Sequence, residues 1–460
     1  MDSELIYGIP VRILNIYYLL AFVVFVLMAW RYRTGNFILF LLCVAFEGTL
    51  SYCVPGLTPQ YMRVIYVLWI TYLFIKLKAW SVIKGKMKLL LWTFVIFSTY
   101  FIWVSLYMND DGSLMTFSQY SKYYVPFLTM LVLGHYHHRN PAYTVYLNIF
   151  WGEVIFIQIV FGIIKFVLLR FHFYEGVVGT FGEINGGNTG TSFPLMALAW
   201  VLLNSNMDIR GWKSWLFIFG LLFFGMAAAK RAIVALFPFF FLVFAMFVAK
   251  KRYKKGVVSV IILLPIFFYL GLRLTPSLNP EDKIWGSFDP EFALHYAEDY
   301  SVGKENSQGK REEGTGRVGA VIYISQKIMN IDGYTKESLT GYGLDRIVST
   351  ASKKDYYNRD YNYGIDHRGS LTGYVRLYLS IGLIGVVLFF IYYCWYFHLI
   401  QYGRLQLSMF VLVMYDFIFY GAQIVYQPLI AILFVFIMYY SQIQYTSKGK
   451  FVGQKHKYFT

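Results

Sequence analysis

The sequence predicts an all-α integral membrane protein with about 12–13 transmembrane helices and one large extracytoplasmic loop domain. Hydrophobic residues make up 58% of its 460 residues, and only 14% are charged, against about 25% in an ordinary soluble domain. Apolar runs close to the length of a membrane-crossing helix recur along the chain. Aromatic residues, 21% of the chain, gather at the ends of many runs, as is typical of membrane interfaces.

The apolar runs define the candidate spans in order. They lie at 11–30, 36–54, 61–78, 88–107, 119–135, 143–169, 191–205, 213–229, 232–249, 256–273, 374–398, 405–421 and 426–442. The runs 119–135 and 191–205 are short, so a re-entrant loop is an alternative for each. The first run follows Asp2 and Glu4 without a basic cluster, which is a poor start for a signal peptide, so we expect it to be a permanent span.

Lysine and arginine residues follow the odd-numbered spans, whereas the other short connections, apart from Lys230–Arg231, are neutral or acidic. The positive-inside rule therefore predicts an N-terminus outside and a C-terminus in the cytoplasm. This distribution also explains most of the net charge of +16 as charged cytoplasmic loops, so no nucleic-acid partner is expected. The basic residues concerned are Arg31, Arg33, Lys76, Lys78, Lys84, Lys86, Lys88, Arg139, Arg210, Lys213, Lys250, Lys251, Arg252, Lys254, Lys255, Arg404, Lys448, Lys450, Lys455 and Lys457.

The region 274–373 interrupts this pattern, because it holds 15 of the 25 acidic residues. It divides the chain into a transmembrane bundle (1–273), the large extracytoplasmic loop domain (274–373), C-terminal transmembrane helices (374–442) and a basic cytoplasmic tail (443–460). A polar insertion of this length is expected to be functional. An amphipathic helix is predicted at Arg317–Asn330, where apolar residues recur near helical spacing. These are Val318, Val321, Ile322, Ile324 and Ile328.

Two cationic segments on the predicted outer side are candidate anion sites. Lys230 and Arg231 lie between two apolar runs with no loop to solvate them. Charges in such places are costly and are commonly paired or functional, although a tight hairpin whose cations reach the headgroups is an equal alternative. Arg317 follows Gly314 and Gly316 at the start of the amphipathic helix. Glycines, a helix N-terminus and an arginine favour anion binding, and an ordinary helix cap is the simpler alternative.

Two further segments contain groups suited to sugar chemistry. His367 lies beside Asp366 near the predicted outer membrane surface, where a carboxylate could orient it for proton transfer. A lone exposed histidine is more often inert. The segment Gly179–Gly190 is rich in glycine and includes Asn185 and Asn188. It could line a sugar site or be a flexible loop.

Taken in their order along the chain, these segments resemble the O-antigen ligase and O-antigen polymerase superfamily of bacterial surface-polysaccharide assembly. The counterparts are Gly179–Asn188, Ala229–Arg231, Gly316–Arg317, Gly341–Gly343, His367 and Gly382–Gly385. The resemblance covers roughly 180–390 and is a pattern of order and context rather than a strict signature. Arg368 follows His367 where the family usually has asparagine, which is a departure from the family pattern. A ligase of this family is also expected to have twelve spans with both ends inside.

The resemblance implies a glycosyltransferase in the bacterial cytoplasmic membrane that faces the periplasm. Its donor would be a glycan on a polyprenyl diphosphate, such as undecaprenyl diphosphate, and its acceptor a second glycan. Arg231 and Arg317 would stabilise the diphosphate leaving group, and His367 would act as general base. Lys230, Arg376, Asn185, Asn188 and Arg368 would bind substrate. No cofactor and no metal is implied, and a flippase and a chain-length regulator are expected partners.

Other functions are compatible with the sequence. An O-antigen ligase would transfer the glycan to lipid A-core, and we prefer the polymerase because nothing in the sequence identifies that acceptor. A metal-dependent glycosyltransferase would use Asp110 and Asp111 in an early outer loop. A transporter or flippase would use the charges inside spans, although no internal repeat and no paired broken helices are evident. Those charges are Glu47, Glu153, Lys165 and Asp416.

Cysteine and histidine usage points to no metal site. Cys43, Cys53 and Cys394 show neither a disulfide framework nor metal-binding spacing. His135, His137 and His138 form a cluster, but it lies in a short predicted cytoplasmic loop beside Arg139, and we do not assign a metal to it.

Overall fold

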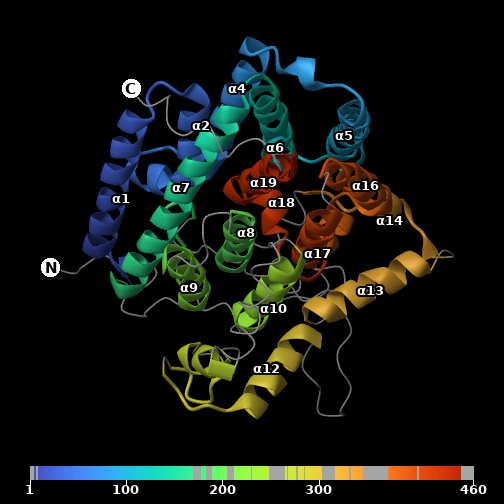
Figure 1. Ribbon diagram of the computed structural model, residues 1–460. Coiled ribbons are helices and arrows are strands. Elements are labelled where there is room, and N and C mark those ends of the chain that lie inside the picture. The colour runs from blue at the N-terminus through green and yellow to red at the C-terminus, as the bar shows by residue number, and fades with distance from the viewer. Residues whose placement is uncertain are drawn as a thin grey trace.

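The computed structural model describes residues 5–6, 9–168, 178–182, 189–204, 212–228, 231–247, 265–266, 268–275, 278–283, 285–302, 316–330, 333–344, 371–400 and 403–446. Across these ranges the chain is mainly helical (Figure 1). A short antiparallel pair, β1 (Leu5–Ile6) and β2 (Ile9–Pro10), precedes the first helix.

The helices of the first half are α1 (Val11–Arg31), α2 (Asn36–Ala45), α3 (Glu47–Cys53), α4 (Pro59–Lys76), the 3₁₀ turn η1 (Ala79–Val82), α5 (Lys86–Trp103), the π-helical turn η2 (Val104–Met108), α6 (Ser113–Arg139) and α7 (Pro141–Leu168). Those of the second half are α8 (Thr189–Leu203), α9 (Trp212–Ala227), α10 (Arg231–Phe247), α12 (Pro290–Val302), α13 (Arg317–Met329), α14 (Lys336–Thr340), α16 (Gly373–His398), α17 (Gly403–Phe419), α18 (Gln423–Tyr426) and α19 (Pro428–Thr446).

Four of the described helices are long and apolar enough to cross a membrane. They are α1, the continuous pair of α5 and η2, α7 and α16. The count rises to five if α2 and α3, which meet at a bend of 76°, form one broken span. Other apolar helices, such as α8 and α19, are shorter in their described parts. The helical class and compatibility with a multi-pass membrane protein are thus confirmed, whereas the larger number of spans stays a prediction.

Helix α1 illustrates why lipid is the natural solvent of this surface. On one side of α1 the side chains of Leu14, Tyr17 and Tyr18 are buried against the rest of the protein. The opposite side leaves Leu19 62% exposed and Trp30 68% exposed. An apolar surface of this kind is unfavourable in water, whereas hydrocarbon accommodates it without cost. At the centre of the bundle, α8 and α19 are surrounded by other helices (Figure 1).

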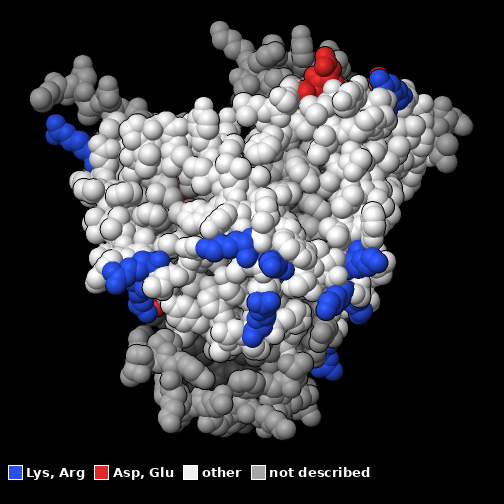
Figure 2. Space-filling view, turned by 90° about the horizontal axis from the view of Figure 1, so that it is seen from above, with Lys and Arg blue, Asp and Glu red and all other residues white. Residues whose placement is uncertain are grey.

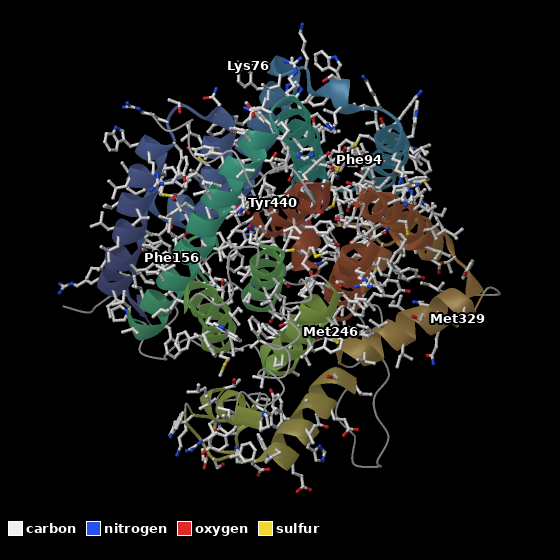
Figure 3. All side chains as sticks on the ribbon, viewed as in Figure 1. Lys76, Phe94, Phe156, Met246, Met329 and Tyr440 are labelled. Carbon is white, nitrogen blue, oxygen red and sulfur yellow. The ribbon has the colours of Figure 1, made fainter. Side chains whose placement is uncertain are left out.

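The predicted inner end of the bundle carries exposed basic residues. Helices α4 and α6 run parallel, and their first turns lie side by side. There Arg63 of α4 donates to Ser118 of α6, with Nη1 and Oγ 2.7 Å apart. Lys76, at the end of α4, lies at the top of the molecule in Figure 3. Seen from that end, the surface carries several lysine and arginine side chains and few acidic ones (Figure 2). This agrees with the predicted charge asymmetry.

The polar region between the bundle and α16 contains ordered local structure in its described parts. Arg273 donates from Nε to the Gly286 carbonyl at 2.8 Å and lies over the Trp285 ring. Hydrogen bonds from Ser287 lower the pKa of Glu281. Helix α12 lies at the opposite edge of the molecule from Lys76, and α13 runs from near α12 to the right side of the view (Figures 1 and 3). That these segments form an extracytoplasmic domain stays a prediction.

Helix α13 confirms the predicted amphipathic helix within one residue of its expected end. It begins at Arg317 and ends at Met329. Ala320 and Ile324 form its buried side. The predicted apolar face also included Ile322, which is 47% exposed. The buried face is therefore narrower than the sequence predicted.

Candidate functional site

Two glycine motifs of the sequence meet at a break in α16. The break is at Gly382, whose φ of 70° interrupts the helix. The segment Gly341–Gly343 lies against it, where Tyr342 donates its backbone N–H to Leu379 O at 2.7 Å and Gly343 donates to Ser380 O at 3.3 Å. A Cβ at Gly341 would lie 2.5 Å from the Ile381 nitrogen. Glycine is therefore required where the two backbones approach so closely.

Side chains from α5 and the loop after η2 complete the hydrogen bonding of this break. The Tyr100 hydroxyl lies 3.0 Å from Ile381 O and 3.1 Å from Leu339 O. Asn109 donates from Nδ2 to Ser380 O at 3.2 Å and to Thr340 O at 3.0 Å. The carbonyls that the break releases from helical hydrogen bonding are thus satisfied by protein donors, which makes this junction structural.

Asp111, a candidate of the metal-dependent alternative, takes part in the same junction. It is buried, and its Oδ2 accepts the backbone N–H of Leu344 at 2.9 Å. Asp110 has a φ of 54°. In the described part of the chain, no group of three or more His, Cys, Asp or Glu side chains could hold a metal ion. The geometry therefore gives Asp111 a role in positioning the Gly341–Gly343 segment.

The segment Gly179–Gly182 fills a second break, between α2 and α3. Thr180 donates from Oγ1 to the Ala45 carbonyl at 2.8 Å and receives the Gln158 side chain on the same hydroxyl. Its backbone N–H donates to Gln158 Oε1 at 2.7 Å. A Cβ at Gly48 would overlap the Gly182 backbone. The described half of this motif is thus a packing element, while Asn185 and Asn188 lie outside the described residues.

These two breaks correct one argument from the sequence. We expected no paired broken helices, which spoke against a transporter. The structure has one break between α2 and α3 and another at Gly382. In broken-helix transporters the released backbone groups coordinate substrate or ions. Here Ala45 O and Ser380 O already accept hydrogen bonds from the protein, so the breaks do not provide free ligands of that kind.

Arg317 lies at the junction of α13, α17 and α8. Its guanidinium carbon is 4.2 Å from the centre of the Tyr420 ring, and it is within electrostatic reach of Asp416. The Tyr420 hydroxyl is 2.8 Å from Thr191 Oγ1. Asp416 is buried and accepts a hydrogen bond from Ser192 Oγ at 2.6 Å. Arg317 therefore lies against a hydrogen-bonded group of side chains at the end of α17.

Arg376 lies near two other cations, Lys122 of α6 and Arg63 of α4. Both arginines are within electrostatic reach of Lys122. The Lys122 ammonium donates to Gln119 Oε1 at 2.6 Å and lies 5.0 Å from the centre of the Tyr426 ring. We call Arg63, Lys122 and Arg376 the three-cation cluster. The described part of the chain supplies no ion pair to any of them.

Comparison with protein-family models, with curated proteins and with solved structures finds no match. The site is therefore interpreted from its own geometry. Arg317 and Arg376 are the predicted site residues whose side chains the structure describes. Arg317 contacts Tyr420, just after α17, and Arg376 is within electrostatic reach of Tyr426, the last residue of α18.

The other predicted site residues fall outside what can be described. Lys230, Asn185, Asn188, His367 and Arg368 are outside the described residues. Arg231 begins α10, and its side chain is likewise outside them. The predicted pairing of Arg231 with Arg317 and the role of His367 as a base therefore stay predictions.

Sequence reasoning missed Lys122 and Arg63. Both lie inside predicted spans, at 119–135 and 61–78, and charge inside a span is the signal that would have identified them. Two of the charges that were noted there, Glu153 and Lys165, have partners in or next to α1. Glu153 forms an ion pair with Arg31 at 2.8 Å and accepts from the Tyr32 hydroxyl, and buried Lys165 lies over the Tyr17 ring.

Proposed function

We propose that this chain is a membrane glycosyltransferase that joins polyprenyl-diphosphate-linked glycans at the outer face of the bacterial cytoplasmic membrane. The supporting observation is that Arg317 contacts Tyr420, just after α17, and that Arg376 is within electrostatic reach of Tyr426, at the end of α18. Residues far apart in the sequence thus present one guanidinium group on each side of α18. Guanidinium groups suit this chemistry because they form paired hydrogen bonds with phosphate oxygens.

In the proposed reaction, an acceptor hydroxyl oxygen attacks the anomeric carbon of the donor sugar. The bond from that carbon to the diphosphate oxygen breaks, and the diphosphate leaves with the electron pair. Arg317 and Arg231 stabilise the negative charge that develops on the diphosphate. His367 takes the proton of the acceptor hydroxyl. The diphosphate is already an activated leaving group, so the proposal requires no nucleotide and no metal.

The proposed topology has thirteen spans and places the 274–373 region outside. A reporter fused after Thr460 should be cytoplasmic, and a cysteine introduced near Ser307 should react with an impermeant reagent from outside. Labelling of residues 250–255 from outside would reverse the orientation and remove the proposed site from the outer face.

Polymerisation and ligation are separated by the glycans of a cell that lacks the protein. If it is a polymerase, single lipid-linked repeats should remain and long chains should be lost. Accumulation of long chains on the polyprenyl carrier would instead identify a ligase. Unchanged glycans together with loss of solute uptake would support the transporter and contradict the proposal.

Replacement of Arg317 tests the leaving-group role. Charged hydrogen bonds contribute about 1.5–3 kcal/mol, so Arg317→Ala should slow transfer roughly ten- to a hundredfold or more. Arg317→Lys should recover little, because the forked geometry is lost although the charge is kept. Lys327→Ala is a matched control on α13, since Lys327 faces the Tyr323 and Tyr342 rings. Chain length is read on surface glycans at equal protein levels.

His367→Ala gives the complementary result. It should block transfer while donor binding persists, because a general base contacts the acceptor rather than the diphosphate. Normal chain lengths in both Arg317→Ala and His367→Ala would contradict the mechanism.

A further inference from the structure

The contacts that the structure describes for the three-cation cluster link helices but do not pair its charges with any carboxylate. Arg63, Lys122 and Arg376 come from three different helices. Both arginines are within electrostatic reach of Lys122, and Arg63 binds Ser118, one turn before Lys122 on α6. Like charges repel one another, and partial burial strengthens that repulsion because the surroundings screen it poorly. A cluster of this kind is unfavourable unless an anion neutralises it.

The hydrogen bonding of the cluster is also incomplete. The Nε atoms of Arg63 and Arg376 are buried, and within the described part of the chain neither has a hydrogen-bond partner. Arg63 uses Nη1 to bind Ser118 Oγ, and Lys122 binds the neutral oxygen of Gln119. Buried polar groups in folded proteins are nearly always satisfied by protein, water or a bound ion. The unsatisfied N–H groups therefore indicate a missing acceptor.

The chemistry of the acceptor follows from the donors. Two guanidinium groups and one ammonium group match the several oxygens and multiple charges of a diphosphate. The cluster lies near the helix ends at which α4, α6 and α16 begin, the predicted outer end. Nearby at the starts of α4 and α6, Tyr61 is 62% exposed and Leu114 is 63% exposed. These apolar side chains favour a diphosphate that is attached to a lipid.

We propose that the three-cation cluster binds the diphosphate of a second polyprenyl-linked glycan, distinct from the donor at Arg317. The identity of this ligand as the acceptor rests on the proposed function. Polymerisation joins two glycans that each carry a lipid diphosphate, and it needs two diphosphate sites. Transfer of a glycan to lipid A-core needs one site of this kind.

The test measures binding of farnesyl diphosphate to the full-length protein in neutral-lipid nanodiscs by calorimetry. The wild type should bind two equivalents. Lys122→Met should weaken one of them about ten- to a hundredfold, because one charged donor is lost. Arg317→Ala should weaken the other. Lys122→Arg should retain both, and Lys327→Met is the matched lysine control on the same side of the protein.

Unchanged binding of both equivalents in Lys122→Met and in Arg376→Leu would overturn the proposal. The proposal is also overturned if the wild type binds only one equivalent of farnesyl diphosphate and Arg317→Ala abolishes that binding. If Lys122→Met does not fold, Arg376→Lys provides the same test through loss of the guanidinium fork. Thermal melting with and without farnesyl diphosphate then reports whether that variant still gains stability from the ligand.

Inorganic pyrophosphate distinguishes a lipid headgroup from a free anion. Weaker binding of pyrophosphate than of farnesyl diphosphate at the cluster supports a lipid-linked ligand, and equal binding overturns that part. The proposed function fails separately. If Lys122→Met loses one equivalent but cells without the protein keep normal glycan chains, the diphosphate site stands and the polymerase does not.

Discussion

The break at Gly382 and the three-cation cluster are two polar regions of the same bundle that differ in whether their buried polar groups form hydrogen bonds. At the break, the released carbonyls of Leu379, Ser380 and Ile381 all accept hydrogen bonds from other segments. In the cluster, the buried Nε atoms of Arg63 and Arg376 find no hydrogen-bond partner among the residues that the structure describes. A polar region whose groups are hydrogen-bonded within the protein has a structural role, whereas buried donors without partners point to a ligand.

The largest expected effect is on stability and comes from Gly382→Ala. A Cβ at this position would overlap the backbone of Leu339 and Thr340, and the φ of 70° is unfavourable for alanine. Overpacking and backbone strain together should cost roughly 2–6 kcal/mol. The loss is measured as a lower thermal melting temperature of the purified protein.

Two control glycines separate the causes. Gly56→Ala tests a positive φ of 79° without close neighbours, and Gly403→Ala tests neither strain nor close packing. A melting temperature for Gly382→Ala equal to that of Gly403→Ala would show that the break is not held by this contact.

A smaller loss is expected for Asn109→Leu. This change removes the Nδ2 donor that Ser380 O and Thr340 O share. Leaving buried carbonyls short of a donor should cost about 1–3 kcal/mol. The exposed Asn140 gives a matched control in Asn140→Leu. Equal melting temperatures for the two variants would indicate that the break does not depend on side-chain donors.

The smallest effect is expected for Lys122→Met in the absence of ligand. Replacing one of three neighbouring cations with an apolar side chain of similar length relieves repulsion, so the free protein should keep its stability or gain up to about 1 kcal/mol. A clear destabilisation would mean that Lys122 has a structural role, so the cluster would then resemble the break at Gly382 rather than differ from it.

Hydropathy predicted where helices lie better than it predicted how they break. The first predicted span, 11–30, differs from α1 by one residue. The run 36–54 was predicted as one span, yet it bends by 76° between α2 and α3. The cause is a hydrogen-bonding partner, Thr180, that is distant in the sequence. A short predicted span at 119–135 lies within the longer helix α6, since polar residues shorten an apolar run without ending a helix.

The candidate site was predicted in part for the same reason. Arg317 could be predicted because glycines and an amphipathic pattern mark its helix start. Its platform of Tyr420 and Asp416 depends on contacts between distant helices. Lys122 and Arg63 indicate a binding site only because they lie close together in the fold. Nothing local in the sequence indicates that α4 and α6 bring them together.

The junction at Gly382 also bears on the order in which the protein is synthesised. Every group that satisfies the broken helix precedes it in the chain, from Tyr100 and Asn109 to the 341–343 segment. When Gly382 leaves the ribosome, its partners have already been made. The break therefore never has to wait for a later segment, and α16 can be completed as soon as it is translated.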